Sequence, residues 1–230
     1  MVAEHCVGAQ APLIDAASLH HDGVGSGLAF YIFGTPVTLS PSPCIHTAGF
    51  RANGFPHRYT HCETDDPAHV IQRCREPGSG GGSVTIPLKE SVIPELDALS
   101  DVARKIGAVN TITKLRDGSL FGDNTDWLGI KAGLESRRLA TAGSVGLICG
   151  AGGTARAACH ALQQMCVGRV LILNPRTPSR ADAVAAEFGN CDAVVDGVVS
   201  CAAHGPPLAW FASDSTLPCD RLPGSGGKPI

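Results

Sequence analysis

Short apolar runs alternate along this chain with segments in which apolar residues recur at helical spacing. Residues 28–33 form an apolar run that Gly34-Thr35-Pro36 closes, which is typical of a buried strand. Trp127, Ile130 and Leu134 instead follow the spacing of one helix face. This alternation favours an α/β fold. Strands are predicted at residues 28–33, 57–62, 84–87, 108–114, 119–122, 144–149 and 170–173, and helices at 44–53, 94–106, 126–139 and 180–188, with an Ala-rich helix ending near 164.

Glycine marks several of the predicted connections. Residues 78–82 are predicted to be a flexible loop that delivers the strand at 84–87. Asp117-Gly118 indicates a hairpin turn that returns the chain through 119–122. Beyond about residue 199 the pattern fades into Pro, Gly, Ser and Cys without periodicity, so we predict an irregular tail at 200–230.

Length and charge narrow the classes of protein. The 230 residues suffice for one large domain or two small ones. A net charge of −3 with a pI near 6.3 gives no whole-protein attraction to nucleic acid or to an anionic membrane. The first residues lack a basic region followed by an apolar core, and no apolar run approaches the about 20 residues of a membrane span. We therefore expect a soluble, cytoplasmic protein.

The ten cysteines and nine histidines form no recognisable metal or disulfide pattern. Neither a CxxC pair nor an HExxH spacing occurs. Without a secretory signal a reducing compartment is expected, in which most cysteines are small buried apolar residues or inert surface thiols. The sequence predicts no metal site.

A glycine cluster follows the predicted strand at 144–149 and opens the Ala-rich helix. This order is the context of a dinucleotide fingerprint, with an ordinary glycine-rich loop as the alternative. Gly150 permits a tight turn, Gly152 lets the backbone approach a pyrophosphate, and Ala155 keeps the third position small. N–H groups at the helix start would bind the phosphates. The predicted cofactor-binding residues here are Gly150, Ala151, Gly152, Gly153, Thr154 and Ala155.

The residues after the next strand, 170–173, indicate which nucleotide binds. NAD sites carry Asp or Glu there for the ribose hydroxyls, but no acid occurs between Val167 and Ala181. Arg176 and its neighbours could instead hold a 2′-phosphate by charge-assisted hydrogen bonds, with a solvated basic turn as the alternative. The sequence therefore favours NADP over NAD, and the predicted binding residues are Asn174, Arg176 and Thr177.

Several polar residues stand next to the predicted strands of the first half. Lys89 follows the run at 84–87, where it could be partly desolvated at the mouth of a sheet and give or take a proton. Ser40 and Ser42 lie on one proline-restricted loop and could bind a carboxylate, although local capping of a turn is the default explanation. Asn110 lies on a predicted strand of mostly apolar residues, where its side chain is either a hydrogen-bonded amide of the core or a ligand contact. Asp126 begins a helix, where capping is the ordinary role.

Taken together and in this order, these segments resemble the shikimate/quinate dehydrogenase family. The resemblance covers residues 28–190. The local sequence around Ser40 and Ser83 is most similar to that of fungal members, including the dehydrogenase-like part of multidomain aromatic-pathway proteins and the quinate-pathway repressors. The matching segments are 33–36, 40–43, 84–90, 106–111, 122–126, 150–155 and 174–177.

The resemblance implies a role for each candidate. Lys89 matches the catalytic lysine of the family and Asp126 the aspartate paired with it. Ser40 and Ser42 match the serines that bind the substrate carboxylate. The groups that match contacts to the ring hydroxyls are Thr85, Asn110 and Asp126. The implied oxidoreductase reaction is the reversible NADP-dependent reduction of 3-dehydroshikimate to shikimate in aromatic amino acid biosynthesis, with quinate as the alternative substrate. The implied partner is thus a small hydroxylated acid, and the oligomeric state cannot be read from the sequence.

The resemblance also implies a domain layout. Residues 1–27 are expected to be a leader or linker and 28–126 an α/β substrate-binding domain. Residues 127–139 would form a connecting helix, and 140–199 an incomplete Rossmann-type domain that binds NADP.

The chain departs from the family pattern at three places. Pro175 separates Asn174 from Arg176, where the family has Asn-Arg-Thr, and His46 is followed by Thr47 rather than Asn. No counterpart of the later strands and helices is recognised in the tail. The chain is therefore expected to be C-terminally truncated, with an uncovered sheet edge and an exposed core face. A non-catalytic module that senses quinate or shikimate, or an inactive fragment, is the alternative to an enzyme.

Overall fold

The computed structural model describes residues 27–140, 142–194 and 209–212. Contacts within the chain divide it between Thr125 and Asp126. We call the described residues up to Thr125 the N-terminal unit, and those from Asp126 onward the C-terminal unit. The predicted leader, apart from Gly27, and most of the predicted tail lie outside the described residues.

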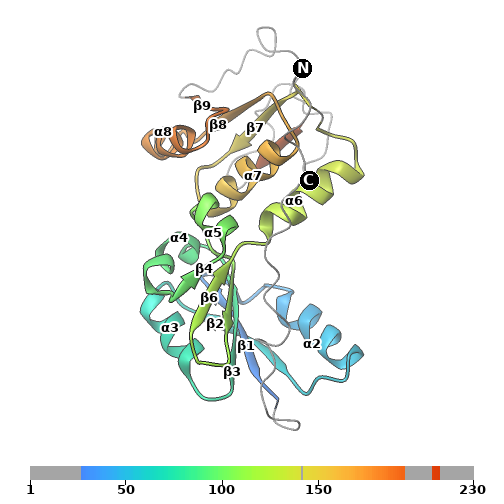
Figure 1. Ribbon diagram of the computed structural model, residues 1–230, viewed down its shortest axis with the longest axis vertical. Coiled ribbons are helices and arrows are strands. Elements are labelled where there is room, and N and C mark those ends of the chain that lie inside the picture. Colours follow the sequence, from blue (N-terminus) through green and yellow to red (C-terminus); the bar gives the residue numbers. More distant parts are fainter. Residues whose placement is uncertain (1–26, 141, 195–208, 213–230) are drawn as a thin grey trace. The chain divides into compact units, whose positions relative to one another are not determined.

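The N-terminal unit is built on a six-stranded mixed sheet in the order β2-β1-β3-β5-β6-β4 (Figure 1). β1 is parallel to β2 and β3, whereas β5 is antiparallel to β3 and β6. The strands are β1 (Ala29–Gly34), β2 (Arg58–Glu63), β3 (Ser79–Val84), β4 (Ala98–Leu99), β5 (Thr111–Lys114) and β6 (Leu120–Asp123). The helices are α2 (Ser42–Ala52), α3 (Pro67–Arg75), α4 (Leu88–Ser91), the 3-10 helix η1 (Ile93–Glu95) and α5 (Asp101–Ile106).

β1 is buried on both faces, which explains its uninterrupted apolar run. Tyr31 and Phe33 pack with Val70 of α3. Ile32, which points to the opposite face, packs with Tyr59 in a cluster that a phenyl ring of α2 adjoins. The predicted strand at 28–33 is confirmed, and its alternate residues build two separate cores.

The glycine run that we predicted as a flexible loop instead forms much of β3, so that prediction is wrong. Residues 79–82 are buried in the sheet. Gly80 lies against the ring of Phe30 and Gly82 against the carbonyl oxygen of Tyr31, and a Cβ at either position would collide with them. The missing side chains therefore serve close packing of neighbouring strands rather than flexibility.

The helix predicted at 94–106 is wrong over its first half. Residues 98–99 form β4, which pairs in parallel with β6. Asp97 accepts a hydrogen bond from the backbone N of Leu120 at 2.7 Å, which draws the chain into the sheet. Ser100 then caps α5, because its Oγ accepts a hydrogen bond from the backbone N of Ala103 at 2.9 Å. The helix can therefore begin only at Asp101.

Helix α3 was not predicted, although its start carries a capping signal. Asp66 Oδ1 accepts a hydrogen bond from the backbone N of Ala68 at 2.9 Å, and Pro67 occupies the first helical position.

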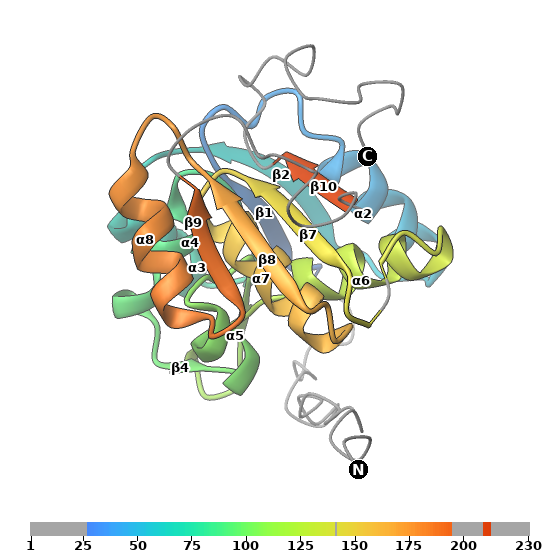
Figure 2. The ribbon, with the colours of Figure 1, turned by 90° about the horizontal axis from the view of Figure 1, so that it is seen from above.

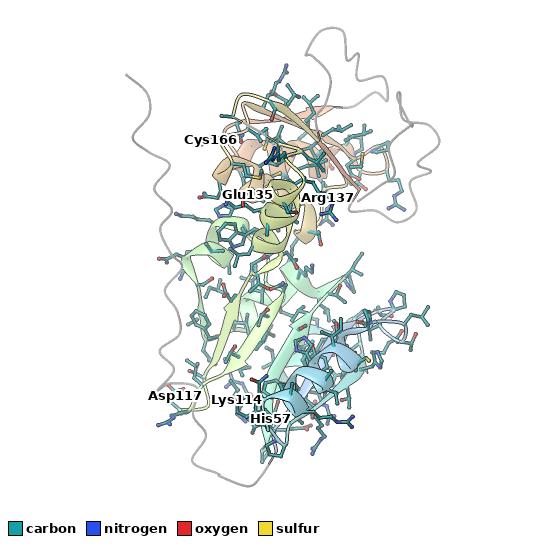
Figure 3. All side chains as sticks on the ribbon, turned by 90° about the vertical axis from the view of Figure 1, so that its right-hand side faces the viewer. His57, Lys114, Asp117, Glu135, Arg137 and Cys166 are labelled. Atoms are coloured by element: carbon teal, nitrogen blue, oxygen red, sulfur yellow. The ribbon has the colours of Figure 1, made fainter. Side chains whose placement is uncertain are left out.

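The β5–β6 hairpin, by contrast, was predicted, and Lys114 and Asp117 mark its turn (Figure 3). Within the described residues, no helix is both long enough and apolar enough to cross a membrane.

The C-terminal unit is built on a parallel sheet in the order β10-β7-β8-β9 (Figure 2). Helices α7 and α8 each connect two neighbouring strands and pack on one face of the sheet, around Ile148 and Val170. This arrangement confirms the predicted α/β class and is that of a Rossmann-type half. The strands are β7 (Val145–Cys149), β8 (Arg169–Leu173), β9 (Cys191–Val194) and β10 (Ala209–Ala212), and the helices are α6 (Asp126–Ser136), α7 (Gly153–Gln164) and α8 (Pro178–Glu187).

The tail that we predicted to be irregular contributes β10, which is a correction. β10 pairs in parallel with β7, from Ala209 beside Gly146 to Ala212 beside Cys149. β7 is therefore not left as an uncovered edge. The sheet face away from α7 is not exposed either, because its members are only 2–8% exposed: Leu147, Cys149, Leu171 and Leu173. The missed signal was the short apolar run at 209–212, and β9 was not predicted either.

Candidate functional site

The residues that we predicted to bind substrate lie together at one edge of the N-terminal sheet, namely the edge at which β1 and β3 have their carboxyl ends. β1 and β3 are parallel neighbours that end with Phe33 beside Val84, so their carboxyl ends lie side by side. β1 is followed by the loop with Ser40 and by the start of α2 at Ser42, and β3 is followed by Thr85 and Lys89. Ligands of α/β proteins commonly bind where parallel strands end. The fold thus brings these two segments, 45 positions apart at Ser40 and Thr85, to one edge.

Asn110 lies at the same edge, because it immediately precedes β5, which runs in the opposite direction to β3. Its backbone carbonyl accepts a hydrogen bond from Val84 N at 2.7 Å, and its backbone N donates to Asp123 O at 3.0 Å. Its side-chain Oδ1 accepts from Thr125 N at 2.9 Å, and Nδ2 donates to Thr125 Oγ1 at 3.0 Å. The amide therefore holds the residue that directly precedes Asp126.

Lys89 lies in a one-turn helix rather than at the end of a strand. β3 ends at Val84, and Thr85 adds one more hydrogen bond, from its backbone N to Phe33 O at 2.8 Å. The predicted strand at 84–87 is therefore wrong beyond Thr85. The half-buried Lys89 belongs to α4, and its backbone O accepts a hydrogen bond from Val109 N at 2.7 Å. This bond fastens the lysine turn to the segment that carries Asn110.

Ser40, in the loop after β1, and Ser42, which the structure places as the first residue of α2 rather than in the loop, are hydrogen-bonded to each other. Ser40 Oγ donates to Ser42 Oγ at 3.1 Å and accepts from the backbone N of Ser42 at 3.3 Å. His61 of β2 places its Nε2 atom 3.1 Å from the carbonyl oxygen of Ser40. The bond to the Ser42 backbone is the local capping that we considered as the alternative. The same geometry holds the two hydroxyls together, as joint recognition of a carboxylate requires.

Asp126 is the first residue of α6, and its contacts place it in the C-terminal unit. The next residue, Trp127, packs edge-on against His160 of α7, with 5.0 Å between ring centroids. This contact fixes the start of α6 within its own unit. Lys89 belongs to the other unit, so the pairing of Lys89 with Asp126 stays a prediction.

A hydrogen-bonded pair beside the N-terminal edge was missed from the sequence. Tyr59 Oη donates to Ser83 Oγ at 2.7 Å. The Tyr59 ring stacks on His46 of α2, with 4.3 Å between centroids and 4° between planes. Burial raises the pKa of Tyr59, so the phenol keeps its proton. Ser83 was detectable, because it stands two residues before Thr85, near the end of β3. Nothing in the sequence pairs Tyr59 with it.

The glycine cluster forms the turn between β7 and α7. Gly150 has a φ of 112°, a conformation that side chains rarely adopt, and its backbone N donates to Leu173 O at 2.8 Å. Gly152 is the N-cap of α7, and no heavy atom lies within 4 Å of the position that its Cβ would take. Ala155 is fully buried. A pyrophosphate fits this arrangement, because the helix start is open and carries no side-chain cap.

The loop after β8 leaves the sheet beside the glycine turn, because β7 and β8 are parallel and Cys149 lies beside Leu173. Asn174 Nδ2 donates to the carbonyl oxygen of Thr177 at 2.8 Å and closes a turn that contains Pro175 and Arg176. Arg176 is exposed in this turn. The turn thus contains the additional proline and leaves Arg176 exposed two positions after Asn174.

Two comparisons with known sequences match this chain. A family model described as the shikimate dehydrogenase substrate binding domain matches residues 32–112. The pentafunctional AROM polypeptide of Yarrowia lipolytica is 45% identical over 176 residues, which are 73% of this chain and 11% of that polypeptide. The chain therefore spans about a tenth of the length of this multifunctional relative.

Solved structures are similar over most of the chain. The dehydroquinate dehydratase and shikimate dehydrogenase from S. pombe AroM is 36% identical, with a TM-score of 0.65 over 86% of this chain and 39% of that one. Shikimate 5-dehydrogenase from Thermus thermophilus, solved in complex with NADP(H) and shikimate, is 32% identical. Its TM-score is 0.70 over 85% of this chain and 75% of that chain.

Proposed function

Because the chain belongs to the shikimate dehydrogenase family, we propose that it interconverts 3-dehydroshikimate and shikimate with NADP(H) as its cofactor. The observation that carries this proposal is the gathering of Ser40, Ser42, Thr85, Lys89 and Asn110 at one edge of the N-terminal sheet. Paired hydroxyls suit a carboxylate, further polar groups suit ring hydroxyls, and a lysine suits proton transfer. A hydroxylated cyclic acid requires this combination.

Each residue has a defined task in the proposed reaction. A bound nicotinamide supplies or accepts the hydride. During reduction, the Lys89 ammonium gives a proton to the ketone oxygen as that oxygen gains negative charge, and the lysine is reprotonated from solvent. During oxidation, neutral Lys89 takes the proton of the hydroxyl. Ser40 and Ser42 hold the carboxylate, and Asp126 orients both Lys89 and a ring hydroxyl.

The C-terminal unit supports NADP rather than NAD. The open start of α7 at Gly152 suits a pyrophosphate, and the neighbouring loop offers Arg176 and Thr177 to a 2′-phosphate. No carboxylate stands in the turn after β8, where an NAD site would need one for the ribose hydroxyls. Asn174, which closes the turn, is a positioning group in this proposal.

The proposal is tested by following NADP⁺ reduction with shikimate, using the purified full chain, Lys89→Ala and a matched control, Lys105→Ala. Lys105 is an exposed lysine of α5. We expect the control to match the wild type and Lys89→Ala to be about 10²-fold slower or worse, as for loss of a general acid–base. Comparable turnover by Lys89→Ala would exclude the proton-transfer role. Quinate and NAD⁺, tested in parallel, decide substrate and cofactor preference.

A second candidate function is binding of shikimate or quinate without turnover. It is favoured by the family match at residues 32–112, which concerns substrate binding alone. Calorimetric binding of either acid with no detectable reduction of NADP⁺ or NAD⁺ would support this sensing role. Turnover by the wild-type chain would exclude it.

A further inference from the structure

The phenol of Tyr59 links two segments that are far apart in the sequence. Tyr59 stands on β2 and is only 6% exposed. Its hydroxyl reaches Ser83 Oγ on β3 at 2.7 Å, although β1 lies between these two strands in the sheet. Burial raises the pKa of Tyr59, so the phenol remains a proton donor at neutral pH. The bond therefore persists over the pH range in which most enzymes work.

The Tyr59 ring is held from the other side by α2. His46 stacks on it with 4.3 Å between centroids and 4° between planes. His46 lies four residues after Ser42 on the same helix, so the two side chains share one helix face. The position of the tyrosine ring is therefore coupled to the helix that begins at the serine loop.

Ser83, at the other end of the contact, stands on β3 two residues before Thr85, whose backbone N continues the pairing with β1 through a hydrogen bond to Phe33 O at 2.8 Å. When Tyr59 donates to Ser83 Oγ, the hydroxyl proton of Ser83 must be directed elsewhere. From Ser83 the chain continues to Thr85 at the end of this pairing and then to Lys89 in α4. Tyr59 thus controls the direction in which the Ser83 hydroxyl can donate.

We propose that Tyr59 is a positioning residue that, through Ser83 and His46, holds the Ser40–Ser42 loop and the Thr85–Lys89 segment in the relative arrangement that binds the substrate. This inference rests on the proposed function. It adds a residue that does not itself touch the substrate. A purely structural tyrosine would contribute to stability alone, whereas a positioning tyrosine also changes substrate affinity.

The experiment uses the full chain and calorimetric titration with shikimate. Tyr59→Phe keeps the ring and the stack on His46 and removes only the hydroxyl. The matched control is Tyr31→Phe, which removes the hydroxyl of the only other tyrosine, on the opposite face of the sheet. Ser83→Ala and the double variant complete a cycle that isolates the contact between Tyr59 and Ser83. Thermal unfolding of each variant reports any general loss of structure.

We expect Tyr59→Phe to raise the Kd for shikimate about fivefold to tenfold, as for loss of one ordering hydrogen bond, with Tyr31→Phe unchanged. In Tyr59→Phe the KM should rise more than kcat falls, and the double variant should bind no more weakly than Ser83→Ala. Unchanged affinity in Tyr59→Phe, or losses that simply add in the double variant, would overturn the positioning role alone. No shikimate binding by the wild-type chain would overturn the proposed function and this role together.

Discussion

Substituting Gly152 by alanine should weaken cofactor binding about 10²-fold and leave the fold intact. The residue has φ −102° and ψ −172°, which alanine adopts without strain, and its Cβ would meet no atom within 4 Å. The expected cost in stability is therefore that of alanine instead of glycine at an N-cap, about 0.5–1 kcal/mol. In the proposed complex, however, the added methyl group would occupy the space in front of the first N–H groups of α7.

The expected loss of affinity follows from the bonds that the methyl group would block. Two backbone N–H bonds to a phosphate, each contributing about 1.5 kcal/mol, amount to about 3 kcal/mol. That corresponds to roughly a 10²-fold increase in Kd. The assay is a fluorescence titration with NADPH, paired with urea unfolding to measure stability. The matched control is Gly189→Ala, because Gly189 is also surrounded by open space and lies outside the glycine turn.

Three outcomes would refute this reasoning. If Gly152→Ala binds NADPH as tightly as the wild type does, the start of α7 is not the phosphate site. If Gly152→Ala and Gly189→Ala lose affinity equally, the effect is not local to the turn. A large loss of stability in Gly152→Ala would contradict the open space around it.

Two further predictions concern stability and thiol chemistry. Ser100→Ala should lower the free energy of unfolding, measured in urea, by about 2 kcal/mol. The substitution removes both the cap of α5 and the hydrogen bond that Ser100 Oγ donates to Asp123 Oδ1 at 2.5 Å. A loss below about 0.5 kcal/mol would contradict this prediction. Burial raises the pKa of the Cys74 thiol from 9.0 to about 12, so iodoacetamide at pH 8 should label exposed Cys44 well before Cys74 in the native protein. Since this thiol stays protonated in the folded state, its contribution to stability is complete below pH 9 and is lost as the pH rises from 9 to 12, a loss that Cys74→Ala should lack.

Much of the local structure could be predicted because it depends on near neighbours in the chain. The β5–β6 hairpin follows from Asp117-Gly118, and the turn at Gly150 follows from a strand, glycines and a helix in succession. Lys89 was placed correctly after a strand, although in a helical turn rather than on the strand itself. These features need no knowledge of which distant segments meet.

The elements that were predicted wrongly all depend on contacts between distant residues. Glycine favours no single backbone conformation, so the role of Gly80 and Gly82 is decided by Phe30 and Tyr31 of the neighbouring strand. Residues 98–99 fall within the helix predicted at 94–106, but they form a strand because Asp97 accepts a hydrogen bond from the backbone N of Leu120 on β6. β10 becomes a strand only through its pairing with β7. In each case a partner at least 23 positions away overrides the local preference.

The sequence by itself determined the α/β class, the dinucleotide fingerprint at 150–155 and a lysine poised after a strand, because hydrophobic spacing and glycine placement act within a few residues. Only the tertiary structure decided that the serine loop, the Lys89 turn and Asn110 share one sheet edge, since that depends on the register between β1, β3 and β5. The hydrogen bond from Tyr59 to Ser83 belongs to the same class. It requires two strands separated by a third, and no local pattern in the chain encodes that arrangement.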